Sequence, residues 1–174
     1  MPLHIIIDGY NLIRQSHSLS SLDRKDIQHG RRALLDMLAA YKKLRPHRIT
    51  VVFDGISDSA FSSEKEKIKG IEVRFSRRSD SADTVIKELA SGYREKALIV
   101  SSDMDVVRFA EAKGAATISS PLFENKIRAA SYFDGAGTED EEEEAERRTD
   151  TKKKGPGRRL SKKIRLNIAR AGML

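Results

Sequence analysis

The 174-residue sequence contains no cysteine, and this absence excludes several kinds of functional site. Disulfides, thiolate zinc sites and cysteine nucleophiles are all ruled out. Any metal ion must therefore be bound by carboxylate, imidazole or carbonyl groups. Oxygen ligands favour hard cations such as Mg²⁺ or Mn²⁺.

The sequence also lacks long hydrophobic runs. No stretch approaches the roughly 18 consecutive apolar residues of a membrane span, and Asp8 comes too early for the apolar core of a secretory signal. These two absences predict a cytoplasmic protein with no membrane segment. Hydrophobic residues make up 39% of the chain, which is enough for one compact domain with a modest core.

The net charge is positive and favours a polyanionic partner. The formal charge is +7 and the pI is about 9.7, as expected of a protein that neutralises phosphates. Residues 139–174 contain 11 Lys+Arg against 8 Asp+Glu, a balance of +3, which leaves +4 for residues 1–138. Charge alone does not distinguish RNA from DNA.

Short β-branched runs alternate with helical periodicity between residues 3 and 128. This pattern predicts a three-layer α/β domain, here assigned to residues 1–134, with a mainly parallel five-stranded sheet. The runs are continuously apolar, as is typical of strands covered on both faces. The five predicted strands are residues 3–7, 48–53, 71–75, 97–100 and 115–118.

Helical spacing connects these strands. Apolar residues from Leu22 to Leu44 recur at about 3.6-residue intervals and predict a long helix that ends before Pro46. A second helix is predicted around Val85 to Tyr93, and a third over residues 103–113, closed by Gly114. Pro121 opens a last helix that runs to Arg128.

Residues 135–174 form a charged tail with a different character. Residues 139–146 are almost wholly acidic, and residues 152–159 are basic with Gly and Pro among them. Neither segment can bury a core, so we expect this region to be disordered. Residues 160–174 could form a short basic helix on contact with a partner.

Aspartates stand at the ends of several predicted strands. Asp8 follows the first strand, Asp54 the second, and Asp103 and Asp105 the fourth, whereas Asp83 begins the helix after the third. Because parallel strands bring their carboxyl ends to one edge, these residues are expected to meet there. Two carboxylates about 5 Å apart repel by roughly 3 kcal/mol at an effective dielectric near 20.

A divalent cation would relieve this repulsion. It would also polarise a phosphodiester and lower the pKa of a bound water, which supplies a hydroxide without a histidine base. Each aspartate also has a structural alternative. Asp80, Ser81 or Asp103 could cap a helix, and Asp8-Gly9 and Asp54-Gly55 could be ordinary turns.

Four ordered motifs resemble the NYN domain family, in its YacP-like branch, within the PIN and flap-nuclease superfamily. IIIDGYNLI is similar to the opening motif of the branch, and VVFDG to the second-strand motif of flap nucleases. SADTVIKELA resembles the central acidic helix, and SSDMDVVRFAEAKGA the motif with paired aspartates. The resemblance covers roughly residues 1–130 and does not include the charged tail.

The resemblance implies a PIN-like fold and divalent-metal-dependent hydrolysis of RNA, usually by an endonuclease. By position, it implies that Asp8, Asp83 and Asp103 are metal ligands, with Asp54 and Asp105 completing or supporting the set. Asn11 matches the asparagine of the opening motif. It would orient a ligand or a phosphate, with a turn-forming residue as the alternative.

Four side chains near the same edge are candidates for contact with RNA. Arg14, Arg77 and Arg78 could bind phosphates, although exposed arginines commonly serve only solvation. Tyr10 could stack on a base, with core packing as the equal alternative. The tail could bind RNA or a ribosomal surface.

Other functions fit the sequence less well. A non-catalytic RNA-binding or ribosome-associated module of the same fold is the main alternative, but clustered anions facing phosphate would not help a binder. A toxin-like PIN nuclease lacks a recognisable antitoxin groove. A haloacid-type phosphatase is disfavoured because Tyr10 stands where a second Asp is expected.

Overall fold

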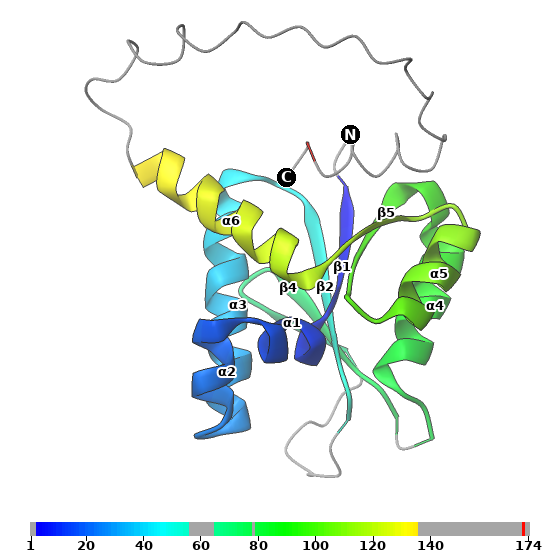
Figure 1. Cartoon of the computed structure of the whole chain (residues 1–174), viewed down its shortest axis with the longest axis horizontal. Helices are drawn as coiled ribbons and strands as arrows, with labels where there is room; N and C mark the ends of the chain where they lie inside the picture. Colours follow the sequence, from blue (N-terminus) through cyan, green and yellow to red (C-terminus); the bar gives the residue numbers. More distant parts are fainter. Residues whose placement is uncertain (1–2, 56–64, 78, 136–171, 173–174) are drawn as a thin grey trace, which may run out of the picture.

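The computed structural model describes residues 3–55, 65–77, 79–135 and 172, in which a six-stranded sheet lies between two layers of helices (Figure 1). The strands are β1 (His4–Asp8), β2 (Arg48–Phe53), β3 (Lys65–Ile68), β4 (Ile71–Phe75), β5 (Ala97–Val100) and β6 (Ala116–Ile118). The helices are α1 (Gly9–Gln15), α2 (His17–Asp23), α3 (Ile27–Leu44), α4 (Ala82–Tyr93), α5 (Met104–Ala112) and α6 (Ser120–Gly135), with a 3-10 turn η1 (Arg94–Lys96) before β5. The predicted three-layer α/β architecture is confirmed.

The sheet places five parallel strands side by side. Its order is β3-β4-β2-β1-β5-β6, with β1 at the centre and hydrogen-bonded to both β2 and β5. Asp8 pairs in register with Val52, so β1 and β2 end level with each other. The carboxyl ends of the five strands therefore share one side of the sheet, which we call the carboxyl edge.

The sheet divides the buried core into two parts. Ile5 and Ile7 of β1 pack with residues of α1, α3 and α6, whereas Ile6 packs with residues of α4 and α5. Alternate side chains of a strand point to opposite faces, so a strand covered on both sides must be apolar throughout. The two helix layers lie on either side of the strands in Figure 1.

Polar side chains start the helices that leave the carboxyl edge. Asp8 caps α1 by accepting the backbone N–H of Asn11, and Ser81 caps α4 by accepting that of Thr84. Asp103 caps α5 in the same way. Each cap satisfies a backbone donor that the helix leaves unpaired, and it fixes where the helix begins.

The sheet has one strand more than predicted. β3 pairs antiparallel with β4 through a turn at Lys69 and Gly70, both of which have positive φ. Its sequence, KEKI, is exposed at the edge of the sheet and lacks the apolar run that marks the other strands. A charged edge strand is recognisable only from its pairing.

The prediction of one long helix between the first two strands was wrong. Leu22 lies in α2, and a separate helix α3 starts at Ile27 after its own cap, Asp26, and ends at Leu44. The last helix is longer than predicted: α6 runs from Ser120 to Gly135, whereas the predicted helix ended at Arg128. Within the described part of the chain, none of the helices is both long and apolar enough to span a membrane.

The predicted charged tail lies outside the described residues, except for residues 135 and 172. This includes the acidic run, the basic run and the possible helix at residues 160–174. The predicted boundary at residue 134 falls at the end of α6, the last described helix.

Candidate metal-binding carboxylate site

Asp8, the last residue of β1, is almost fully buried at the carboxyl edge. Its Oδ1 accepts the backbone N–H of Asn11 at 3.3 Å, and its Oδ2 accepts the hydroxyl of Ser101 at 3.1 Å. Burial raises the pKa of Asp8 to about 6; the two hydrogen bonds oppose this rise, and repulsion from Asp83 and Asp54 adds to it. Asp8 therefore lies within electrostatic range of carboxylates from two other elements.

Asp54 joins the end of β2 to the start of α4. Its exposed side chain accepts the backbone N–H of Ala82, the first residue of α4, at 2.7 Å. The neighbouring Gly55 donates its N–H to the hydroxyl of Ser76 at 3.0 Å. A Cβ at position 55 would lie 2.1 Å from the carbonyl oxygen of Ser76, so this close approach requires glycine.

Asp83, in the first turn of α4, is the centre of the electrostatic interactions. Burial raises its pKa most, followed by repulsion from Asp103, with smaller contributions from Asp54 and Asp105. Lys87, one turn further along α4, acts in the opposite direction. Asp83 accepts no hydrogen bond from the described residues, so its carboxylate is available to a ligand.

Asp103 and Asp105 lie at the start of α5. Asp103 is the helix cap, and its Oδ1 accepts the backbone N–H of Asp105 at 2.8 Å. The structural alternative therefore holds for Asp103, but its charge also acts on Asp83. The side chain of Asp105 is 76% exposed and forms an ion pair with Lys87. We call the following five residues the acidic cluster: Asp8, Asp54, Asp83, Asp103 and Asp105.

The donor set of the acidic cluster fits a hard divalent cation, because every side chain offers carboxylate oxygens. Over residues 3–55, 65–77 and 79–135, no three His, Asp or Glu side chains already converge as metal ligands do. Asp54 and Asp105 are exposed and Asp83 is only partly buried. Solvent therefore reaches these three side chains at the carboxyl edge.

Ser101 connects two of the carboxylates and was not predicted from the sequence. It is fully buried directly after β5, where it donates to Asp8 and accepts the backbone N–H of Asp103 at 3.1 Å. The aspartates were identified in the sequence because they follow predicted strands. Ser101 follows β5 in the same way, so the same argument could have identified its hydroxyl group. Ser101 therefore sets the spacing between the ends of β1 and β5.

Asn11 positions the neighbouring loops through its side-chain oxygen. The Oδ1 atom accepts the backbone N–H of Ser102 at 2.9 Å, the hydroxyl of Ser120 at 2.7 Å and the amide of Gln15 at 3.3 Å. The first two bonds hold α1 against the loop after β5 and against the start of α6. The Oδ1 atom of Asn11 therefore makes contacts within the protein, and the role of Asn11 toward a ligand or phosphate stays a prediction.

The prediction that Tyr10 stacks on a base is contradicted by its burial. Tyr10 is only 6% exposed, and its ring packs edge-on against Phe53 at 5.1 Å. Its hydroxyl accepts a hydrogen bond from Arg31 Nε at 2.7 Å. Arg31 is itself buried and lies over Tyr10, Phe53 and Phe75, each at 5.3 Å from the ring centroid. Tyr10 therefore packs in the core, which was the alternative prediction for this residue.

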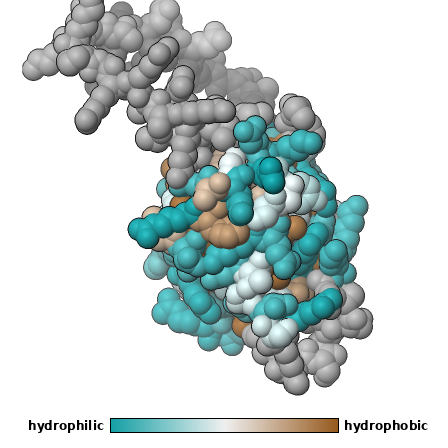
Figure 2. Space-filling view, turned by 90° about the vertical axis from the view of Figure 1, so that its right-hand side faces the viewer, coloured by the Kyte–Doolittle hydropathy of each residue, from teal (hydrophilic) through white to brown (hydrophobic). Residues whose placement is uncertain are grey.

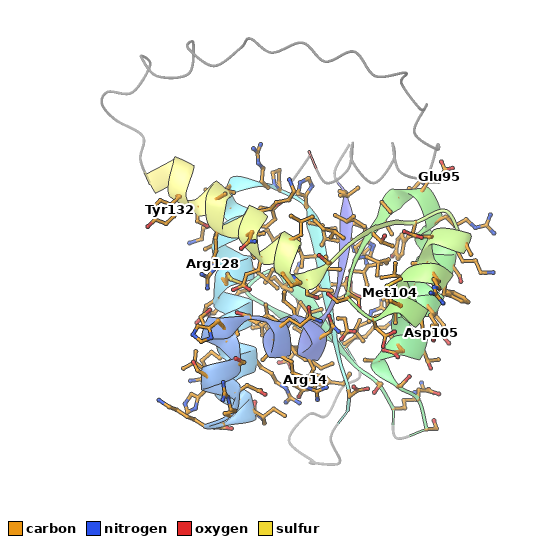
Figure 3. All side chains as sticks on the ribbon, viewed as in Figure 1. Arg14, Glu95, Met104, Asp105, Arg128 and Tyr132 are labelled. Atoms are coloured by element: carbon orange, nitrogen blue, oxygen red, sulfur yellow. The ribbon has the colours of Figure 1, made fainter. Side chains whose placement is uncertain are left out.

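Two of the three predicted phosphate-binding arginines lie on the described surface. Arg14 is exposed in the last turn of α1, 5.7 Å from the centroid of the Tyr10 ring. Arg77 is exposed just after β4, and Arg78 lies outside the described residues. Figure 3 shows Arg14 and Asp105 on helices from opposite sides of the sheet. Arg14 therefore lies in one helix layer, and Asp105 of the acidic cluster lies in the other.

Comparison with known proteins identifies a family and a similar fold. A family model described as "YacP-like NYN domain" matches residues 5–171, beyond the motifs near residue 130 that carry the resemblance. A curated relative, the "Uncharacterized protein YacP" of Bacillus subtilis (strain 168), is 29% identical over 86 residues. That match covers 49% of this chain and spans about half (50%) of the relative.

Solved structures of a Bacillus subtilis protein, Rae1 (YacP), have a similar fold. One superposes with a TM-score of 0.64 at 23% identity and covers 78% of each chain. A single-residue mutant of the same protein has a TM-score of 0.63 at 22% identity and covers 75% of this chain and 78% of that one. The fold is therefore PIN-like, as predicted from the motifs.

Proposed function

The chain belongs to the YacP-like NYN domain family, which is nuclease-like, and from this premise we propose that it is a divalent-metal-dependent ribonuclease that cleaves RNA internally. The observation that supports this proposal most is the mutual repulsion within the acidic cluster. Asp83 is within electrostatic range of Asp8, Asp54, Asp103 and Asp105, which come from three other parts of the chain. Clustered carboxylates repel phosphate unless a cation lies between them.

In this proposal Asp8, Asp83 and Asp103 hold one or two Mg²⁺ or Mn²⁺ ions. Asp54 and Asp105 complete or support the set, directly or through water. When bound, such a cation polarises a phosphodiester and lowers the pKa of water. The buried position of Asp8 and its two hydrogen bonds fix the orientation of one ligand before the metal arrives, which reduces the entropy lost on binding.

Two further groups contribute to the proposed site without holding metal. Ser101 and Asn11 are positioning residues: the first sets the distance between Asp8 and Asp103, and the second holds the loop that carries Asp103. Arg14 and Arg77 are exposed near the carboxyl edge and would bind RNA phosphates. We expect this reaction to take place in the cytoplasm, on free or ribosome-associated RNA.

A cleavage assay tests the proposal. Purified protein is incubated with end-labelled RNA, and separately with DNA, in the presence of Mg²⁺, Mn²⁺ or EDTA. We expect internal cleavage of RNA that EDTA abolishes. Asp8→Asn and Asp103→Asn should each lower the rate at least about 100-fold while leaving the circular dichroism spectrum unchanged, because each removes a cation ligand without changing side-chain volume.

Asp80→Asn is the matched control. Asp80 is an exposed aspartate just before α4, three residues from Asp83, and it is not among the groups that raise the pKa of Asp8 or Asp83. This variant should cleave at the wild-type rate. Equal activity in wild type, Asp8→Asn and Asp103→Asn would contradict the mechanism. Binding of RNA without any cleavage would support the alternative, a non-catalytic RNA-binding or ribosome-associated module.

A further inference from the structure

Lys87 is a basic residue placed among the carboxylates of the acidic cluster. It lies in α4, four residues after Asp83, so both side chains are on the same face of the helix. Its ammonium group forms an ion pair with Asp105 of α5, and this contact links the two helices that cover one face of the sheet. The site prediction from the sequence did not include Lys87.

The charge of Lys87 acts on more than one carboxylate. Attraction to Asp105, Asp83 and Asp103 raises the pKa of Lys87, with the hydrogen bond to Asp105 as the largest cause. In turn, Lys87 is the group that works against the raised pKa of Asp83. Lys87 therefore supplies positive charge to carboxylates that are proposed to bind the metal ion.

The contact between Lys87 and Asp105 is open to solvent on the Asp105 side. The side chain of Asp105 is 76% exposed, whereas that of Lys87 is 25% exposed. Water therefore competes with Lys87 for the Asp105 carboxylate, which limits the stability that this ion pair contributes. In this same position the Nζ atom of Lys87 lies 5.7 Å from the centroid of the Phe109 ring, which also favours an ammonium group.

The face of the molecule that carries Lys87 is mostly polar. The side that carries α4 and α5 is mostly hydrophilic, with hydrophobic residues in small patches between polar ones (Figure 2). Lys113, at the C-terminal end of α5, lies over the same Phe109 ring at 5.4 Å, but within the described part of the chain it forms no ion pair with the acidic cluster. The two lysines thus share a ring and differ in their contact with the acidic cluster.

We propose that Lys87 is an exchangeable counter-ion of the acidic cluster, which neutralises Asp105 in the metal-free protein and is released when the cluster binds a divalent cation. The proposal rests on the metal-dependent function proposed above, and it makes Lys87 a determinant of metal affinity. Asp105 exchanges one positive partner for another, so the cluster is never left without a cation. Because Lys87 competes with the metal ion, the acidic cluster binds metal more weakly than its carboxylates alone would.

Measurement of Mn²⁺ binding to the full-length, metal-free protein tests this inference. Isothermal titration calorimetry gives the dissociation constant for wild type, Lys87→Met and Lys87→Gln. Both variants should bind Mn²⁺ about tenfold more tightly, because they lose a competing charge a few ångströms from the doubly charged ion. Mn²⁺ should also raise the melting temperature of the variants by more than that of the wild type.

Two control variants separate this role from a structural one. Lys87→Arg keeps the positive charge and should bind Mn²⁺ within about threefold of wild type. Lys113→Met removes a lysine from the same ring and should leave the affinity unchanged. Equal affinity in wild type, Lys87→Met and Lys87→Gln would overturn this inference alone. If no form of the protein binds Mn²⁺, the proposed function fails together with it.

Discussion

At the scale of single residues, two titratable side chains are buried in the central strand of the sheet. His4 and Asp8 are the first and last residues of the central strand β1, and both are nearly inaccessible to solvent. His4 donates or accepts a hydrogen bond with Thr50 at 2.8 Å and packs edge-on against Tyr93 at 4.3 Å. A titratable group buried at each end of one strand makes stability depend on pH.

The pH dependence of stability tests the state of His4. Burial, with the charge of Arg48, lowers the pKa of His4 from 6.5 to about 4. Above pH 6.5 His4 is neutral in the folded and the unfolded chain, and its contribution to stability is complete. As the pH falls from 6.5 to 4, only the unfolded chain gains the proton, so the free energy of unfolding decreases by up to about 3 kcal/mol.

Urea unfolding at pH 4.5, 5.5 and 7 measures this effect. His4→Gln should lose less stability than wild type between pH 7 and 4.5, because it lacks the group that the unfolded chain protonates. His17→Gln, which changes an exposed histidine of α2, is the control and should follow wild type. Parallel pH profiles for wild type and His4→Gln would show that His4 is not the cause.

At the scale of elements, the position of α4 relative to the strands decides the geometry of the acidic cluster. The helix is held at its first turn by Ser81 and by the bond from Ala82 to Asp54. The loop after β2 in turn lies against Ser76, at the end of β4. A shift of this loop would therefore move Asp54 and Asp83 together.

Substitution of Gly55 tests this arrangement. Gly55→Ala places a Cβ 2.1 Å from the carbonyl oxygen of Ser76, which is backbone and cannot move aside without displacing the end of β4. We expect the free energy of unfolding to fall by about 2 kcal/mol. Urea denaturation measures the change.

Gly92→Ala is the comparison and should change stability in the opposite direction. Gly92 is exposed within α4, and a Cβ there would meet no atom within 4 Å. Alanine should therefore stabilise the helix by about 0.5 kcal/mol. A Gly55→Ala protein as stable as wild type would refute the close packing of the loop on Ser76.

At the scale of the whole molecule, positive charge is spread over the folded domain and the charged tail. Residues 1–138 have a balance of +4 and residues 139–174 a balance of +3, while the acidic cluster concentrates negative charge at one edge. Under the proposed function, basic residues elsewhere would attract the RNA, and a bound cation would reduce its repulsion by the acidic cluster.

Deletion of residues 139–174 tests the contribution of the tail. The truncated protein should bind RNA more weakly, and its affinity should fall less steeply with salt, because fewer counterions are released on binding. Filter binding from 50 to 300 mM salt measures both quantities, with Ca²⁺ in place of Mg²⁺ to prevent cleavage, and Mn²⁺ affinity should remain as in the full chain. An unchanged affinity and salt slope would assign RNA binding to the folded domain alone.

The sequence by itself determined the class of the fold and the meeting place of the carboxylates. The buried strands are apolar throughout because both faces are covered, so they are recognisable without any partner. Once they are taken as parallel, Asp8, Asp54 and Asp103 must share an edge. These conclusions follow from local patterns together with one rule of topology, and the structure and the family match confirm the fold.

Only the tertiary structure decided which neighbours surround these residues. The edge strand β3, the burial of Tyr10 against Arg31, and the pairing of Lys87 with Asp105 all depend on contacts between segments far apart in the chain. A polar or charged side chain gives no local signal of its partner, because solvent and a distant residue satisfy it equally well. Packing alone makes that choice, and here it places a lysine among the aspartates.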